Sequence, residues 1–85
     1  MLPEKVARSA DALRERLDAG VLSRLGRVEL DHGVTFAFEV AVRIALADLD
    51  DLSSHQQRGE YVSAGRWRDV AEEVERLHGL AMVRA

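Results

Sequence analysis

The chain has 85 residues, of which 47% are hydrophobic and 32% are charged, and its formal net charge is −3. These values predict one folded domain over residues 1–85 and argue against a disordered chain. The sequence contains no cysteine, which excludes disulfides and thiolate metal sites, and no apolar run approaches membrane-spanning length. Because the first residues lack the apolar core of a signal peptide, we expect a cytoplasmic protein with no membrane partner.

The negative charge is concentrated in the middle of the sequence. Residues 31–60 hold six acidic and two basic side chains, whereas the segments on either side are nearly balanced. A basic footprint for nucleic acid is therefore absent from the chain as a whole. Arginine occurs eleven times and lysine once, a bias that we attribute to a GC-rich bacterial genome.

A first helix is predicted from Pro3 to Gly20. Proline suits the first turn of a helix, and glycine suits its C-terminal end. Apolar residues recur every three or four positions and define one buried face: Leu2, Val6, Ala10, Leu13 and Leu17. The apolar residues that follow, up to Gly26, fit either a short helical turn or the entry to a strand.

Residues 27–44 alternate apolar and other side chains, which is the period of a half-buried β-strand. Asp31-His32-Gly33 lies where the alternation breaks, and it fits a three-residue turn with glycine in the left-handed region. This turn sets two facing pairs on the apolar side, Leu30 with Val34 and Val28 with Phe36. We therefore predict a β-hairpin whose second strand extends from Val34 to Ile44.

The same stretch also fits one helix over residues 34–52. Its alanines are good helix formers, and Glu39 and Arg43 stand four apart, which is a favourable helical pair. Its polar residues would form one narrow stripe, as in a buried central helix. This alternative gives an all-α helical bundle with a central buried helix at residues 34–52.

The two predicted strands are unequal in length. Residues from Val40 onward would have no partner strand within the chain, and an isolated hairpin is only marginally stable in water. Pairing with a second copy would satisfy the unpaired strand end. We therefore expect a homodimer joined through this strand, and we assign Val40, Val42 and Ile44 to partner binding.

Two more helices are predicted after the hairpin, one over residues 54–64 and one from Arg66 to Gly79. Ser53 and Ser54 each precede a glutamine by three residues, which is the spacing of a capping box. The last helix would bury one face: Trp67, Val70, Val74 and Leu77. The fold class that follows is α+β, a small two-layer domain with an N-terminal amphipathic helix, a β-hairpin and a C-terminal helical hairpin.

Few side chains are spaced for metal binding. Glu29, Asp31 and His32 offer ligand atoms at the hairpin tip, but stabilisation of the turn by Asp31 explains them better. Asp51 and His55 stand four apart and can face one way on a helix, where capping explains them better than ligation. We predict no metal site.

No motif for catalysis is found. No serine lies in a nucleophile elbow, and there is no glycine-rich phosphate loop. The acidic run of Asp48, Asp50 and Asp51 is interpreted as a solvated edge that could meet a cation or a basic partner. We therefore predict no catalytic residue, no cofactor and no enzymatic activity.

Arg66, Trp67 and Arg68 resemble a contact patch, because an aromatic ring between arginines can stack on bases or hold phosphates. The interpretation that we favour is that Trp67 anchors the last helix in the core and that the arginines pair with nearby acids such as Glu72. We keep the three residues as candidate partner contacts beside those of the strand.

Residues 62–76 contain the run Val62-Ser63-Ala64-Gly65-Arg66-Trp67, followed by Glu72, Val74 and Arg76. This run resembles the second half of ParD-like ribbon-helix-helix antitoxins. In that family a glycine-arginine-aromatic turn joins two helices, and a preceding strand pairs across a dimer to bind DNA. The present chain differs in having a long N-terminal helix first and in the outward strand positions, which are not basic: Thr35, Ala37, Glu39 and Ala41.

Two functions follow from these observations. The one that we favour is a small non-enzymatic protein-interaction or regulatory module, which recognises a partner protein through its sheet edge, acidic middle or apolar tail. The alternative, implied by the resemblance, is a DNA-binding antitoxin or transcriptional regulator, with nucleic acid as its partner.

Overall fold

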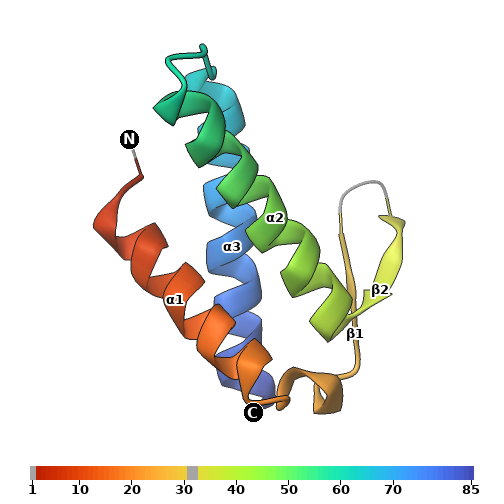
Figure 1. The fold of residues 1–85 in the computed structure, drawn as a ribbon. Coiled ribbons are helices and arrows are strands. Elements are labelled where there is room, and N and C mark those ends of the chain that lie inside the picture. Colours follow the sequence, from red (N-terminus) through yellow and green to blue (C-terminus); the bar gives the residue numbers. More distant parts are fainter. Residues whose placement is uncertain (1, 31–32) are drawn as a thin grey trace.

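The computed structural model describes residues 2–30 and 33–85. Within these residues the elements follow one another as α1 (Glu4–Asp18), a short 3-10 helix η1 (Leu22–Arg24), β1 (Arg27–Glu29), β2 (Thr35–Ala37), α2 (Phe38–Gln57) and α3 (Ala64–Arg84). Helix α3 runs behind α1 and α2 and packs against both, while the hairpin lies beside the first half of α2 (Figure 1). The predicted α+β class, with its order of helix, hairpin and helices, is confirmed.

Helix α1 forms as predicted. Its buried residues include Val6, Ala10 and Leu13, and all three belong to the apolar stripe. The N–H of Val21 bonds to the carbonyl of Arg16 at 3.3 Å, which is the closing bond of a Schellman motif. Gly20 stands at the left-handed position of that motif, with φ of 73°. The segment that follows is the short helical turn η1, not the start of a strand.

The hairpin has the predicted register. Val28 lies opposite Phe36 in the antiparallel pair of β1 and β2. The N–H of Leu30 donates to the carbonyl of Val34 at 2.8 Å, so the second predicted pair also faces across the turn. Gly33 has φ of 74°, as the predicted turn requires. The other two turn residues, Asp31 and His32, lie outside the described residues.

The predicted second strand from Val34 to Ile44 is wrong beyond Ala37. Helix α2 begins at Phe38, whose N–H donates to the carbonyl of Gly26 at 2.9 Å. From this point the buried positions follow helical spacing: Phe38, Ala41, Val42, Ala45, Leu46, Leu49 and Leu52. Residues 38–44 fit both periods, and the helix prevails because it keeps one apolar face in the core as far as Leu52.

The alternative helix over residues 34–52 is therefore correct only in part. Residues 38–52 are helical and central, but 35–37 form a strand, and the all-α bundle is not the fold. The helix predicted over residues 54–64 is also wrong, because α2 continues through Ser53 and Ser54 to Gln57.

A second Schellman motif ends α2. The N–H of Glu60 bonds to the carbonyl of His55 at 2.9 Å, and Gly59 occupies the left-handed position with φ of 76°. After a short loop, α3 begins at Ala64, where the hydroxyl of Ser63 accepts a hydrogen bond from the backbone N–H of Arg66 at 3.2 Å. This cap replaces the predicted one at Ser53 and Ser54.

The predicted end of the last helix at Gly79 is wrong as well. Helix α3 continues to Arg84, because Leu77 and Ala81 are one turn apart and both fully buried. A glycine inside a helix costs about 1 kcal/mol relative to alanine, which is less than the burial of the next turn contributes. The tail at residues 80–83 is thus docked as helix.

Candidate protein-binding groove

The hairpin and α2 enclose a surface groove of about 260 Å³. We call it the hairpin groove, and its lining residues are Leu30, Val34, Phe36, Ile44, Ala45, Asp48 and Glu73. The hairpin supplies one wall, α2 supplies the other, and α3 contributes Glu73. The groove exists because the chain turns from strand to helix at Ala37, so that α2 runs back along the hairpin (Figure 1).

The walls of the groove hold aliphatic side chains that the core leaves exposed. Val34 is 50% exposed and Ile44 is 37% exposed. Val40, one helical turn before Ile44 on the same face of α2, is 43% exposed. Full burial of a valine or isoleucine side chain contributes about 1.5–3 kcal/mol, so a partner that covers the exposed half or less of each of these side chains gains about 1 kcal/mol from each.

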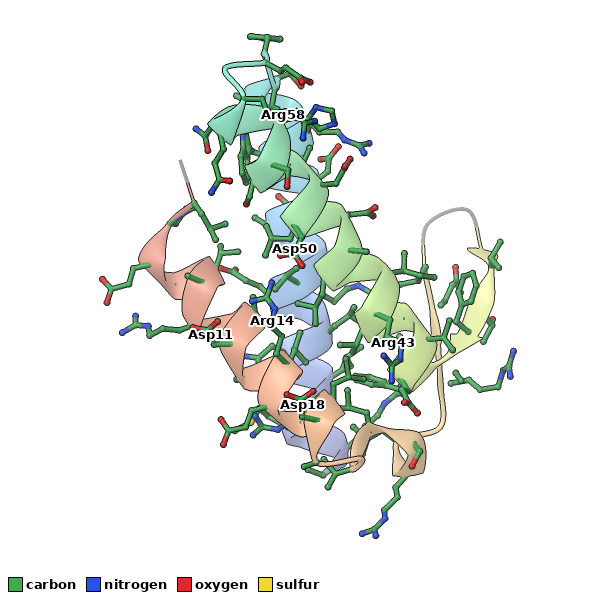
Figure 2. The ribbon with its side chains drawn as sticks, viewed as in Figure 1. Asp11, Arg14, Asp18, Arg43, Asp50 and Arg58 are labelled. Atoms are coloured by element: carbon green, nitrogen blue, oxygen red, sulfur yellow. The ribbon has the colours of Figure 1, made fainter. Side chains whose placement is uncertain are left out.

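One acidic side chain at the groove has no ion-pair partner among the described residues. Asp48 follows Ile44 by one turn of α2, and no cationic side chain lies within 4.0 Å of it. Its neighbours differ: Asp50 binds Arg14 of α1 at 2.7 Å, an ion pair between the two helices that Figure 2 shows. The second acid of the groove, Glu73, pairs with Arg76.

The residues predicted to bind a partner through the strand fall into two groups. Val42 is fully buried in the core, so it holds the fold together and is not a surface contact. Val40 and Ile44 are exposed, but they present a helix face and not the strand edge on which the homodimer was predicted. The predicted pairing of strands from two copies therefore cannot occur at these residues, because they are helical.

The predicted patch of Arg66, Trp67 and Arg68 lies at the other end of α2. It opens α3, beside the C-terminal turn of α2, so the structure does not join it to the hairpin groove. Trp67 is partly buried and packs against the core, as expected for an anchor of the helix. Arg68 lies 3.9 Å from Asp69 and not beside the predicted partner Glu72.

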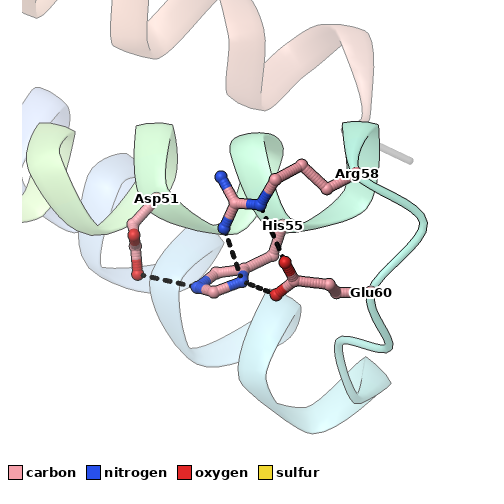
Figure 3. A network of polar contacts seen from close by, with 4 residues as sticks. All are labelled: Asp51, His55, Arg58 and Glu60. Carbon is pink, nitrogen blue, oxygen red and sulfur yellow. Dashed lines mark hydrogen bonds and ion pairs between the residues drawn. The ribbon is translucent and has the colours of Figure 1, made fainter.

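A network of polar side chains surrounds His55 where α2 ends (Figure 3). Its Nε2 lies 3.5 Å from Asp51, its Nδ1 contacts Glu60, and Arg58 donates from Nε to Glu60 at 2.7 Å. The hydrogen bond from Arg58, followed by that with His55, lowers the pKa of Glu60 to about 2. Both ring nitrogens therefore face carboxylates, which suits a link between α2 and the loop after it.

The two carboxylates lie on opposite sides of the imidazole ring and do not converge on one point. In residues 2–30 and 33–85, no group of three or more His, Asp or Glu side chains is placed to hold a metal ion. Beside the network, a shallow pocket of about 420 Å³ includes Tyr61 and Arg66 in its lining. Three of its polar side chains, Asp51, His55 and Glu60, belong to the network, so we interpret the pocket as the surface of the structural link.

Comparison of the chain with models of protein families, with curated proteins and with solved structures finds no match. The ribbon-helix-helix resemblance would require a strand that pairs with the same strand of a second copy. In this structure β2 pairs with β1 of the same chain. Among the described residues, no helix has both the length and the apolar character that crossing a bilayer requires.

Proposed function

We propose that this chain is a non-enzymatic protein-interaction module that binds a segment of a partner protein in the hairpin groove. The observation that carries the proposal is the set of exposed aliphatic side chains that line a groove between two elements, with Val34, Ile44 and neighbouring Val40 turned to solvent. Segments of partner proteins commonly bind by placing an apolar face in a hydrophobic groove.

The charge of the groove indicates the chemistry of the partner. Asp48 and Glu73 both line it, and no arginine or lysine does. A partner segment with apolar side chains and an adjacent lysine or arginine would bury its apolar part between the walls and place its cation beside Asp48. A second copy of this chain, docked groove to groove, would instead bring together two Asp48 carboxylates, neither of which has an ion-pair partner among the described residues, and juxtaposed like charges disfavour association.

Homodimerisation is a separate proposal and does not use the hairpin groove. Among the described residues β2 has β1 on one side and no strand on the other. A second copy could pair with this outer edge, and it would then displace the Nη2 group of Arg27, which donates to the outward carbonyl of Thr35 at 3.1 Å. Light scattering at micromolar concentration tests this proposal, and a mass equal to one protomer would refute it.

Affinity capture with matched variants tests the groove. Ile44→Asp places a charge in one wall, while Val83→Asp makes the same kind of change at an aliphatic residue that is 82% exposed and lies outside the groove. We expect proteins captured from the native cell by the wild type and by Val83→Asp to be lost with Ile44→Asp. Asp48→Lys should weaken the same set, because it reverses the charge that meets the partner's cation.

The result that would overturn the proposal is a set of partners that Ile44→Asp retains in full. Circular dichroism must show that this variant is folded, so that a loss of binding is assigned to the groove. Because Ile44 is already 37% exposed, we expect its replacement to leave the helix content unchanged.

A further inference from the structure

A second pocket, of about 280 Å³, lies at the opposite end of the helices from the His55 network, where α1 and α3 end and η1 begins (Figure 1). We call it the arginine pocket, and its lining residues are Arg16, Val21, Arg24, Leu25, Ala81, Arg84 and Ala85. It shares no residue with the hairpin groove. Arginines from three separate elements, α1, η1 and α3, therefore line one partly apolar hollow.

These three arginines differ from most others in the protein. Six arginines have a carboxylate oxygen within 4.0 Å: Arg8, Arg14, Arg43, Arg58, Arg68 and Arg76. In the described part of the chain, Arg16, Arg24 and Arg84 have none within that distance, and neither do Arg27 and Arg66, which lie outside the pocket. Since the chain carries more acids than bases, with a net charge of −3, this lack does not come from a shortage of acids.

Helix dipoles offset only part of this positive charge. Arg16 lies in the last turn of α1 and Arg84 in the last turn of α3, where a cation is favourable. Each helix end contributes a negative charge of about one half, so the two ends together offset about one of the three positive charges.

The guanidinium of Arg84 is held in place by the protein. Its Nη1 donates to the carbonyls of Leu25 at 3.0 Å and Arg27 at 2.8 Å, and its central carbon lies 5.5 Å from the centroid of the Phe38 ring. Its Nε and Nη2 groups donate to no acceptor among the described residues, and neither does the side chain of Arg24. A fixed guanidinium with unused donors is prepared to bind an oxyanion, because little side-chain freedom is lost on binding.

We propose that the arginine pocket binds a small organic anion. Its phosphate or carboxylate group is held by the guanidinium groups of Arg84, Arg24 and Arg16, and its apolar part packs on Val21, Leu25 and Ala81. A volume of about 280 Å³ is close to the lower end of the range for small-molecule sites, which suits one ring or short chain with one anionic group. This site is independent of the hairpin groove and of the function proposed for it.

Nuclear magnetic resonance titration of the full, isotope-labelled chain tests the proposal. The probes are phenyl phosphate and benzoate, which share a ring and differ in the anion, and sodium chloride at matched ionic strength corrects for screening. We expect saturable shifts of backbone amides in residues 21–25 and 81–85 with at least one probe. Tighter binding of phenyl phosphate would assign a phosphate ligand, and tighter binding of benzoate a carboxylate ligand.

Two variants make the test specific. Arg24→Gln removes one cation at an exposed side chain that donates no hydrogen bond in the described structure, so the fold should persist, and we expect the dissociation constant to rise about tenfold. Arg8→Gln removes a cation that is paired with Glu4 and lies on an earlier part of α1, and it should leave the dissociation constant unchanged.

Three results would overturn the proposal. The first is a shift that grows linearly with either probe and never saturates. The second is an equal dissociation constant for Arg24→Gln and the wild type. The third is a response of the same amides to duplex DNA with none to the two small anions, which would assign the arginines to a nucleic-acid backbone.

Discussion

The glycines at positions 59 and 79 offer a decisive test of where α2 and α3 end. The sequence alone predicts a helix through Gly59 and a helix end at Gly79, whereas the structure shows the reverse: Gly59 ends α2 with φ of 76°, and Gly79 lies inside α3. A methyl group added at either position would meet no heavy atom within 4 Å. Replacement by alanine therefore isolates the effect of the backbone conformation at each site.

The two substitutions should change stability in opposite directions. Gly59→Ala forces an alanine into the left-handed region, which should lower the free energy of unfolding by about 1–2 kcal/mol. Gly79→Ala removes a flexible residue from a helix interior, which should raise it by about 0.5–1 kcal/mol. For a domain of this size 1 kcal/mol shifts the melting temperature by roughly 4–8 °C, so the two variants should differ by about 6–24 °C.

Urea unfolding followed by circular dichroism measures both values on the same protein. Equal unfolding slopes for the wild type and the variants would show that the change lies in stability and not in the extent of unfolding. A stabilising Gly59→Ala together with a destabilising Gly79→Ala would refute the helix boundaries described above. That outcome would restore the predicted helix over residues 54–64 and free the tail at residues 80–83.

Four further outcomes are expected. The pKa of Glu60 is lowered from its usual value of 4.5 to about 2. The contribution of the ionised Glu60 to stability is therefore complete above pH 4.5 and is lost as the pH falls through 2. The difference in unfolding free energy between the wild type and Glu60→Gln should decrease over the same pH range. Phe38→Ala should lower the free energy of unfolding by about 3–5 kcal/mol, because Phe38 is fully buried and the guanidinium of Arg84 lies over its ring. Urea unfolding measures this change, and a loss below about 1 kcal/mol would contradict the prediction. Val42→Asp should abolish the cooperative unfolding transition, because it places a charge in the core, whereas Ile44→Asp should keep the transition. Similar melting curves for the two variants would contradict the assignment of residues 38–44 to a helix. A DNA-binding role for the chain predicts a mobility shift of duplex DNA that weakens with salt, and no shift at low salt would discard that alternative.

Local signals in the sequence were sufficient for α1 and for the hairpin register. The stripe that includes Val6 and Leu13 has a single helical period, and glycine is needed at the end of the helix and in the turn. Residues 34–44 were ambiguous, because alternating apolar residues with alanines between them fit a strand and a helix equally. The choice depends on contacts with distant residues, such as the hydrogen bond from Phe38 to Gly26, which no local pattern reveals.

The candidate sites depended still more on tertiary structure. The exposure of Ile44 follows from the rotation of α2 against the core, and Glu73 reaches the hairpin groove from another helix. In the arginine pocket, Arg24 and Arg84 are sixty positions apart in the sequence, and nothing near either one marks it as part of a cluster. The sequence shows the acidic run at residues 48–51, but it does not show which of these carboxylates lacks an ion-pair partner.

The order in which the chain is synthesised gives the packing of α3 a further consequence. Helix α3 contacts α1 and α2 more extensively than these two contact each other, and Arg84 in its last turn binds the carbonyls of Leu25, just before β1, and of Arg27, the first residue of β1. Domains complete their folding only when the segments that cover their apolar faces have left the ribosome. The apolar faces of α1 and α2 must therefore stay uncovered until α3 emerges, and the nascent chain is most exposed to aggregation and to chaperones over that interval.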